Sequence, residues 1–74
     1  MRKPRVKYRV FQINHLDYGD GHIDNAKRFI GDTYAVSEAQ AVNNISFRTG
    51  ILIDEIVPWS CDGCRHSYLV AERA

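Results

Sequence analysis

The segment from Trp59 to Tyr68, WSCDGCRHSY, is the feature that most restricts how this chain folds. It holds both cysteines of the chain, on either side of Asp62-Gly63. Asp-Gly between two strand-like segments is typical of a two-residue type I′ hairpin turn, because both central residues must adopt positive φ. We therefore predict a hairpin with its tip at 61–64. The predicted cross-strand pairs are Cys61 with Cys64, Trp59 with His66, and Val57 with Tyr68.

The length of the chain, 74 residues, predicts one small domain. A chain of this size buries about 60% of the surface that it exposes when unfolded, so a metal, a disulfide or a second copy adds useful stability. The longest apolar runs, such as Ile51-Leu52-Ile53, fall far short of the about 20 residues that a membrane-spanning helix needs. A signal peptide requires an apolar segment after its basic N-terminus, and this sequence has none there. We expect a cytoplasmic protein with no membrane partner.

The first half of the chain predicts two strands. In residues 5–14, apolar and basic side chains alternate, which is the pattern of a half-buried strand with a basic outer face. The alternation breaks at Phe11, so either a bulge shifts the register or Phe11 and Ile13 are covered on the second face. Residues 15–25 are rich in turn-forming residues and predict a loop. The second strand is expected over residues 27–36.

The helix signals are concentrated in residues 37–49. Ser37 and Gln40 form a capping box, in which the two side chains satisfy backbone N–H groups of the first turn. Gly50 follows where a helix often ends in the left-handed conformation. We therefore predict one helix over this segment.

The last part of the chain predicts the two hairpin strands, over residues 55–60 and 65–72. Pro58 predicts that the first of them lies at an edge of the sheet or carries a bulge, because proline donates no backbone hydrogen bond. The element order is then strand-strand-helix-strand-strand. The predicted fold class is α+β: a two-layer sandwich with one helix packed on a mostly antiparallel four-stranded sheet.

The histidines and cysteines suggest a metal site. Cys61, Cys64 and His66 form the pattern C-x-x-C-x-H, and His22 or His15 from the predicted loop completes a four-ligand set. Thiolates and imidazoles at a tight turn are typical ligands of structural zinc. Two other interpretations remain open: a redox pair, although redox Cys-x-x-Cys motifs usually lie at a helix N-terminus, and a purely structural pair. We expect no obligatory cofactor. If the pattern binds one, zinc is the cofactor that its ligands fit.

Basic residues favour a nucleic-acid partner. They alternate along the first predicted strand, extend over a flexible basic arm at residues 1–4, and recur early in the second strand. Such a surface neutralises phosphates and binds in a salt-dependent way. The alternative is that these charges only solubilise a strand. The candidate nucleic-acid-binding residues are Arg2, Lys3, Arg5, Lys7, Arg9, Lys27 and Arg28.

The run Tyr8-Arg9-Val10, followed after a loop by the run YAVSEAQA at residues 34–41, resembles the strand-strand-helix opening of archaeal ribosomal proteins of the LX type. The resemblance covers about half of the chain and implies an RNA-binding role. The lysine-rich final strand of that family is missing here, and the cysteine-bearing hairpin is extra.

The sequence contains no complete catalytic set, so we expect a non-enzyme. We predict a small interaction or regulatory protein that binds a macromolecular partner, either another protein or a second copy, through its sheet or hairpin. Trp59, His66 and Tyr68 are the candidate partner-binding residues, because aromatic residues are enriched in interface hot spots. Their alternative role is a hydrophobic cluster that closes the core. Nucleic-acid binding and zinc- or thiol-dependence are the competing functions.

Overall fold

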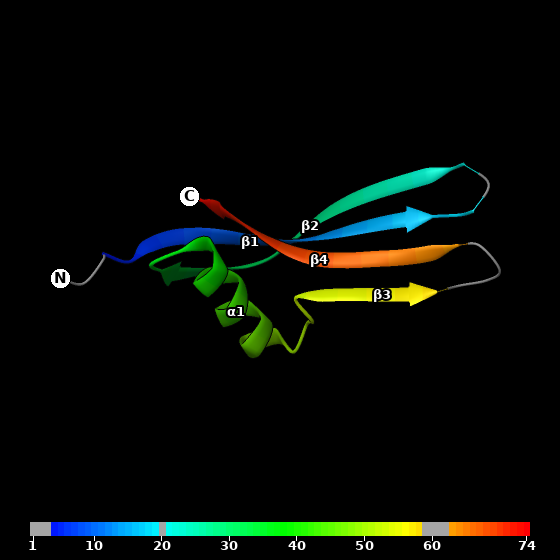
Figure 1. The fold of residues 1–74 in the computed structure, drawn as a ribbon. Helices are drawn as coiled ribbons and strands as arrows, with labels where there is room; N and C mark the ends of the chain where they lie inside the picture. Colours follow the sequence, from blue (N-terminus) through cyan, green and yellow to red (C-terminus); the bar gives the residue numbers. More distant parts are fainter. Residues whose placement is uncertain (1–3, 20, 59–62) are drawn as a thin grey trace.

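The computed structural model describes residues 4–19, 21–58 and 63–74 (Figure 1). The strands are β1 (Val6–Asp17), β2 (Ile23–Ala35), β3 (Asp54–Pro58) and β4 (Cys64–Arg73), and helix α1 (Glu38–Thr49) connects β2 to β3. The four strands form one antiparallel sheet in the order β2-β1-β4-β3. The predicted order β-β-α-β-β and the α+β class are confirmed.

The loop predicted over residues 15–25 is wrong for most of its length, because both strands continue into it. The β1–β2 register runs from Val6 opposite Ala35 to Asp17 opposite Ile23. Polar side chains in this region pair across the strands, and His15 Nδ1 lies 2.7 Å from Asn25 Oδ1. Two glycines with positive φ lie between the strands, at 82° and 92°. The turn is therefore short, and its two glycines adopt positive φ values that other residues adopt only with strain.

A bulge lies in β2, at the point where the alternation in β1 breaks. Val10 is opposite Gly31 and Phe11 is opposite Phe29, so Ile30 has no partner in β1. The pairing of β1 with β4 continues through this point without a shift. Side chains of β1 therefore continue to point to alternate faces, although the apolar-basic pattern of the sequence breaks, and Phe11 lies on the opposite face from Val10.

The β3–β4 register differs from the prediction. Ile56 is opposite His66 and Pro58 is opposite Cys64, so five residues separate the strands and the two-residue turn is wrong. Trp59 and Cys61 lie outside the described residues. Gly63 packs against the β1–β2 turn, where an added Cβ would lie 2.9 Å from the backbone oxygen of Asp17. At this position glycine permits a close approach of two backbones.

Pro58 is the last residue of the edge strand β3, which confirms the predicted edge position. β3 pairs with β4, so its other side is an edge of the sheet. A proline without a donor costs least at the end of such a strand.

Both ends of α1 follow the predicted signals. Ser37 Oγ accepts a hydrogen bond from the backbone N–H of Gln40, and Gln40 Oε1 accepts one from the N–H of Val36. Gly50 adopts φ 76° and donates its N–H to the carbonyl of Ser46 at 2.9 Å. The capping box and the left-handed C-terminus are thus confirmed, with the reciprocal bond of the box on Val36.

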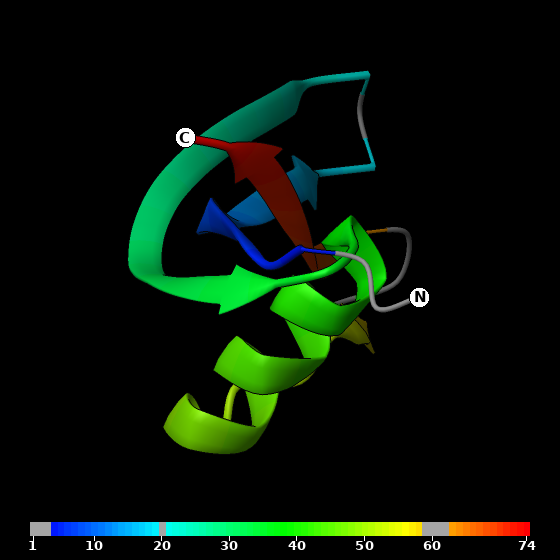
Figure 2. The ribbon, with the colours of Figure 1, turned by 90° about the vertical axis from the view of Figure 1, so that its left-hand side faces the viewer.

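The core lies between α1 and one end of the sheet. Ala41 and Ile45 of the helix are fully buried and cluster with Tyr8, Val10 and Leu69 from the strands. The helix contacts β1, β2 and β4 but not β3. Figure 2, a view along the long axis, shows β2 curving around the sheet towards the helix.

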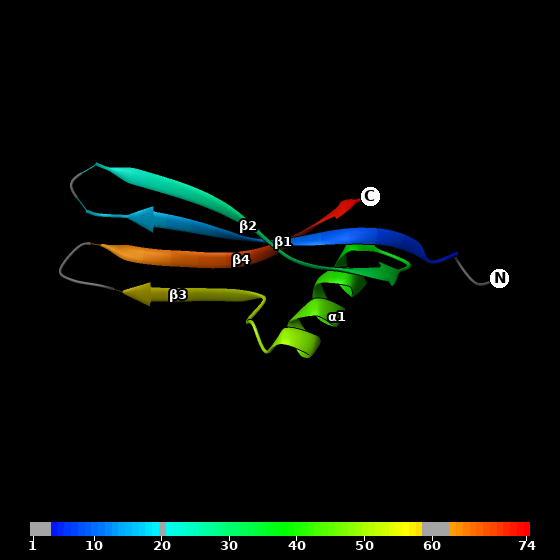
Figure 3. The same cartoon turned by 180° about the vertical axis from the view of Figure 1, so that it is seen from behind.

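The remainder of the sheet extends beyond the helix. The molecule measures 51 × 19 × 19 Å, and its radius of gyration is 14.6 Å, against about 11 Å for a compact chain of this length. We call residues 11–17, 23–29, 54–58 and 64–70 the projecting half, and the helix with the rest of the sheet the covered half; Leu69, at the boundary, packs into the core. The paired ends Asp17–Ile23 and Pro58–Cys64 lie at the free end of the projecting half (Figure 3).

Among the described residues, the one helix is too short and too polar to cross a membrane.

Candidate functional site

The projecting half has one apolar face, on the side of the sheet opposite to α1. The register places Phe11 beside Phe29 and Val70, and Ile13 beside Tyr68. Ile56 of β3 lies on the same side, because its partner His66 alternates in step with Tyr68. This apolar face consists of Phe11, Ile13, Phe29, Ile56, Tyr68 and Val70.

Much of the apolar face is accessible to solvent. Phe29 is 54% exposed and Ile56 is 66% exposed, although both are large hydrophobic residues. The Phe11 and Phe29 rings meet edge to face with centroids 5.6 Å apart. In the part of the chain that the structure describes, α1 is the only helix, and it lies on the other side. The other four members are partly buried, and large apolar side chains exposed together on one face are typical of a binding site.

Polar groups surround the apolar face. Lys27 Nζ lies 4.3 Å from the centroid of the Phe11 ring and forms an ion pair with Glu72 at 2.8 Å. His66 Nε2 lies 2.7 Å from Asp54 Oδ1, and its ring lies 5.1 Å from the Tyr68 ring. An apolar centre with a hydrogen-bonded polar rim is the usual composition of a protein interface.

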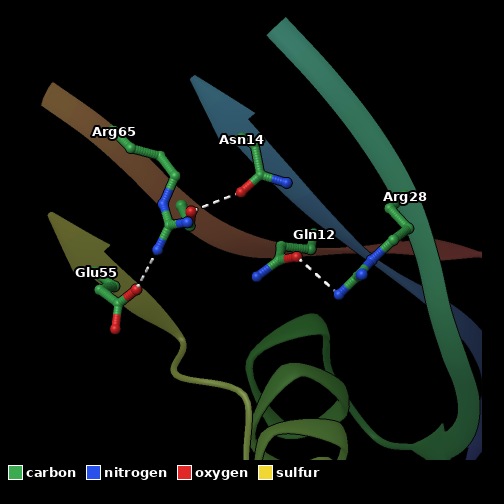
Figure 4. Close-up of polar contacts among 6 residues, drawn as sticks. Gln12, Asn14, Arg28, Glu55 and Arg65 are labelled. Atoms are coloured by element: carbon green, nitrogen blue, oxygen red, sulfur yellow. Dashed lines mark hydrogen bonds and ion pairs between the residues drawn. The ribbon is translucent and has the colours of Figure 1, made fainter. Parts of the chain in front are cut away.

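The helix-side face of the projecting half is polar instead. Three side-chain pairs cross its strands: Arg28 Nη2 donates to Gln12 Oε1 at 3.0 Å, Ser67 Oγ donates to Asn14 Oδ1 at 2.6 Å, and Arg65 Nη2 donates to Glu55 Oε1 at 3.0 Å (Figure 4). They border an open hollow of about 460 Å³. Nε of Arg65 is buried without a hydrogen-bond partner among the described residues. Leu16 and Ala26 also line this hollow, but the large aromatic side chains of the projecting half lie on the other face.

The predicted partner-binding residues lie partly on the apolar face. Tyr68 is a member of the apolar face, His66 is its neighbour among the surrounding polar groups, and Trp59 lies outside the described residues. The remaining members of the face were not predicted. The break in alternation at Phe11 was the signal in the sequence, since it places Phe11 and Ile13 on the face that carries the charged residues earlier in β1.

Of the predicted basic residues, Lys7, Arg9 and Lys27 lie on the face opposite to α1, but acidic side chains lie among them. Lys7 lies 3.6 Å from Asp32, and Arg9 is opposite both Asp32 and Glu72. Arg28 points to the helix side, next to Gln12 (Figure 4).

Of the other two, Lys27 is paired with Glu72, and Arg5 borders a hollow beside Tyr34. Arg2 and Lys3 lie outside the described residues. Because acids alternate with the bases that the structure describes, this surface has mixed charge.

The predicted metal ligands are partly placed. Cys64 is opposite Asp17 at the free end of the sheet, and His66 is bonded to Asp54. His22 lies between β1 and β2, 3.6 Å from Asp24. Cys61 lies outside the described residues, and those residues contain no group of three metal-ligating side chains. The zinc site stays a prediction.

Comparison with known proteins gives no match: no family model, no curated protein and no solved structure matches the chain.

Proposed function

We propose that this protein is a non-enzymatic binding protein that acts through the apolar face of the projecting half. One observation carries the proposal: Phe11 and Ile13 lie on the face of β1 opposite to Tyr8 and Val10, where no described element of the chain covers them. If this face were only solvent-exposed, we would expect charged residues to continue along it after Lys7 and Arg9. The exposed aromatic and branched side chains therefore support protein binding.

The two-layer packing predicted from the sequence enters this proposal in a modified form. At the covered half, α1 is the layer that packs on the sheet. At the projecting half, the bound protein supplies a layer on the opposite face of the same strands. The long strands then serve two cores, one internal and one formed on binding.

Nucleic-acid binding is the weaker candidate. Lys7 and Lys27 each have an acidic partner within 4 Å, which reduces the positive potential that phosphates need.

The proposal is tested by photo-crosslinking in the cells that produce the protein. The photoreactive residue p-benzoyl-phenylalanine replaces Phe29 on the apolar face or, as the matched control, the adjacent Arg28 on the polar face. We expect covalent adducts with protein from position 29 and few from position 28. Equal yields from the two positions, or no adduct from either, contradict the proposed function.

A further inference from the structure

We propose that the apolar face binds a second copy of this chain, sheet against sheet, with the two helices on the outside. This inference rests on the proposed function and names the partner. The first argument is one of area. The chain exposes 5349 Å², whereas a compact monomer of 8.5 kDa exposes about 4,650 Å². The excess, about 700 Å², belongs to the elongated molecule as a whole and is of the same order as the about 800 Å² that each partner buries in a standard interface.

The second argument is charge. Around the apolar face, acids and bases are already paired within one chain: Lys27 with Glu72, and His66 with Asp54. The formal net charge of the chain is only +1. Two identical faces of this composition meet without strong repulsion, and neither needs an oppositely charged partner. In electrostatic terms, a second copy therefore fits this face as well as a different protein does.

The third argument is the size of the core. Among the described residues, the buried hydrophobic cluster comprises only six side chains: Tyr8, Val10, Ala35, Ala41, Ile45 and Leu69. The apolar face also has six members, so pairing two faces buries twelve more side chains per dimer. Small domains commonly gain stability by oligomerisation. A second copy is present whenever the chain is made, so the exposed face is covered from the start.

The geometry permits this arrangement. The apolar side chains extend across all four strands, from Phe29 on β2 to Ile56 on β3, and α1 lies on the opposite side. Face-to-face sheets pack about 10 Å apart, which suits side chains of this size. The same surface then serves both copies, as a two-fold symmetric contact requires. Ile13 and Tyr68, which are cross-strand partners on the central strands, lie near the middle of the interface.

The test is the molar mass of the purified protein, measured by size-exclusion chromatography with light scattering over a dilution series. We expect twice 8.5 kDa for the wild type. Phe29→Asp places a charge on the apolar face and should weaken the dimer at least 100-fold, whereas the neighbouring Arg28→Asp should leave it intact. Circular dichroism establishes that both variants are folded, and Ile56→Asp at the exposed edge is the second variant if Phe29→Asp does not fold.

Two results overturn the dimer. One is a wild type that is monomeric at every concentration. The other is an equal loss of mass in Phe29→Asp and Arg28→Asp, which shows that the contact is not on the apolar face. If the wild type is monomeric while crosslinking from position 29 captures a different protein, the proposed function stands and this inference fails. If no adduct forms either, both fail.

Discussion

Strands β1, β2 and β4 run through both the covered and the projecting halves. Most large apolar side chains lie on the helix side of the sheet in the covered half and on the opposite side in the projecting half. In the covered half, Tyr8 and Val10 face the helix and are buried, while Lys7 and Arg9 point to solvent. Further along β1, Phe11 and Ile13 point away from the helix side. The positions of apolar residues along a strand thus indicate which of its faces is packed against another element. Apolar residues on the other face of the same strand indicate a second packing surface.

The largest expected effect comes from truncating one isoleucine in each half. Ile45→Ala removes a fully buried side chain and should lower the free energy of unfolding by about 2–5 kcal/mol, because it leaves a cavity. Ile56→Ala removes a side chain that is 66% exposed and should cost under about 1 kcal/mol in dilute monomer. Urea unfolding measures both changes. Similar losses in the two variants would refute the contrast between the halves.

A smaller effect is expected at the start of the helix, which belongs only to the covered half. Ser37→Ala removes the hydroxyl that accepts the Gln40 N–H and should cost about 1 kcal/mol, the usual value of an N-cap. Ser37→Asn is the control that retains a capping oxygen and should stay near wild type. Thermal unfolding of the three proteins gives the order, and an alanine variant as stable as the wild type would show that the cap contributes nothing.

The smallest effect is expected at the boundary between the halves, where Lys27 lies over Phe11 and pairs with Glu72. Lys27→Met removes the charge but keeps an apolar chain over the ring. Because both partners are about half exposed, the loss in unfolding free energy should be under about 1 kcal/mol and should shrink in high salt. A loss of several kcal/mol, or one independent of salt, would mean that this pair is part of a core.

The sequence predicted the local features well and the long-range ones only in part. The capping pair Ser37 and Gln40 and the helix end at Gly50 depend on neighbours within a few residues. The extent of β1 and β2 was underestimated, because polar residues such as His15 and Asn25 stabilise strands only when they pair across the sheet.

The candidate site was visible in the sequence only as the anomaly at Phe11. His66 and Tyr68 were predicted as binding residues, but the members contributed by β2 and β3 depend on pairings between distant segments. The hairpin register followed neither the Asp62-Gly63 signal nor the predicted pair Val57 with Tyr68, since Val57 is opposite Arg65. Turn chemistry alone does not set a register that the whole sheet must satisfy.

The sequence by itself determined the element order, the ends of the helix and the break in alternation at Phe11, because backbone propensity and side-chain alternation are local properties. The tertiary structure alone decided which face Phe11 occupies relative to α1. It also decided the role of Gly63, which meets the backbone of Asp17 in the other hairpin. These outcomes depend on strand pairing and helix docking, in which residues far apart in the chain compete for the same limited cover.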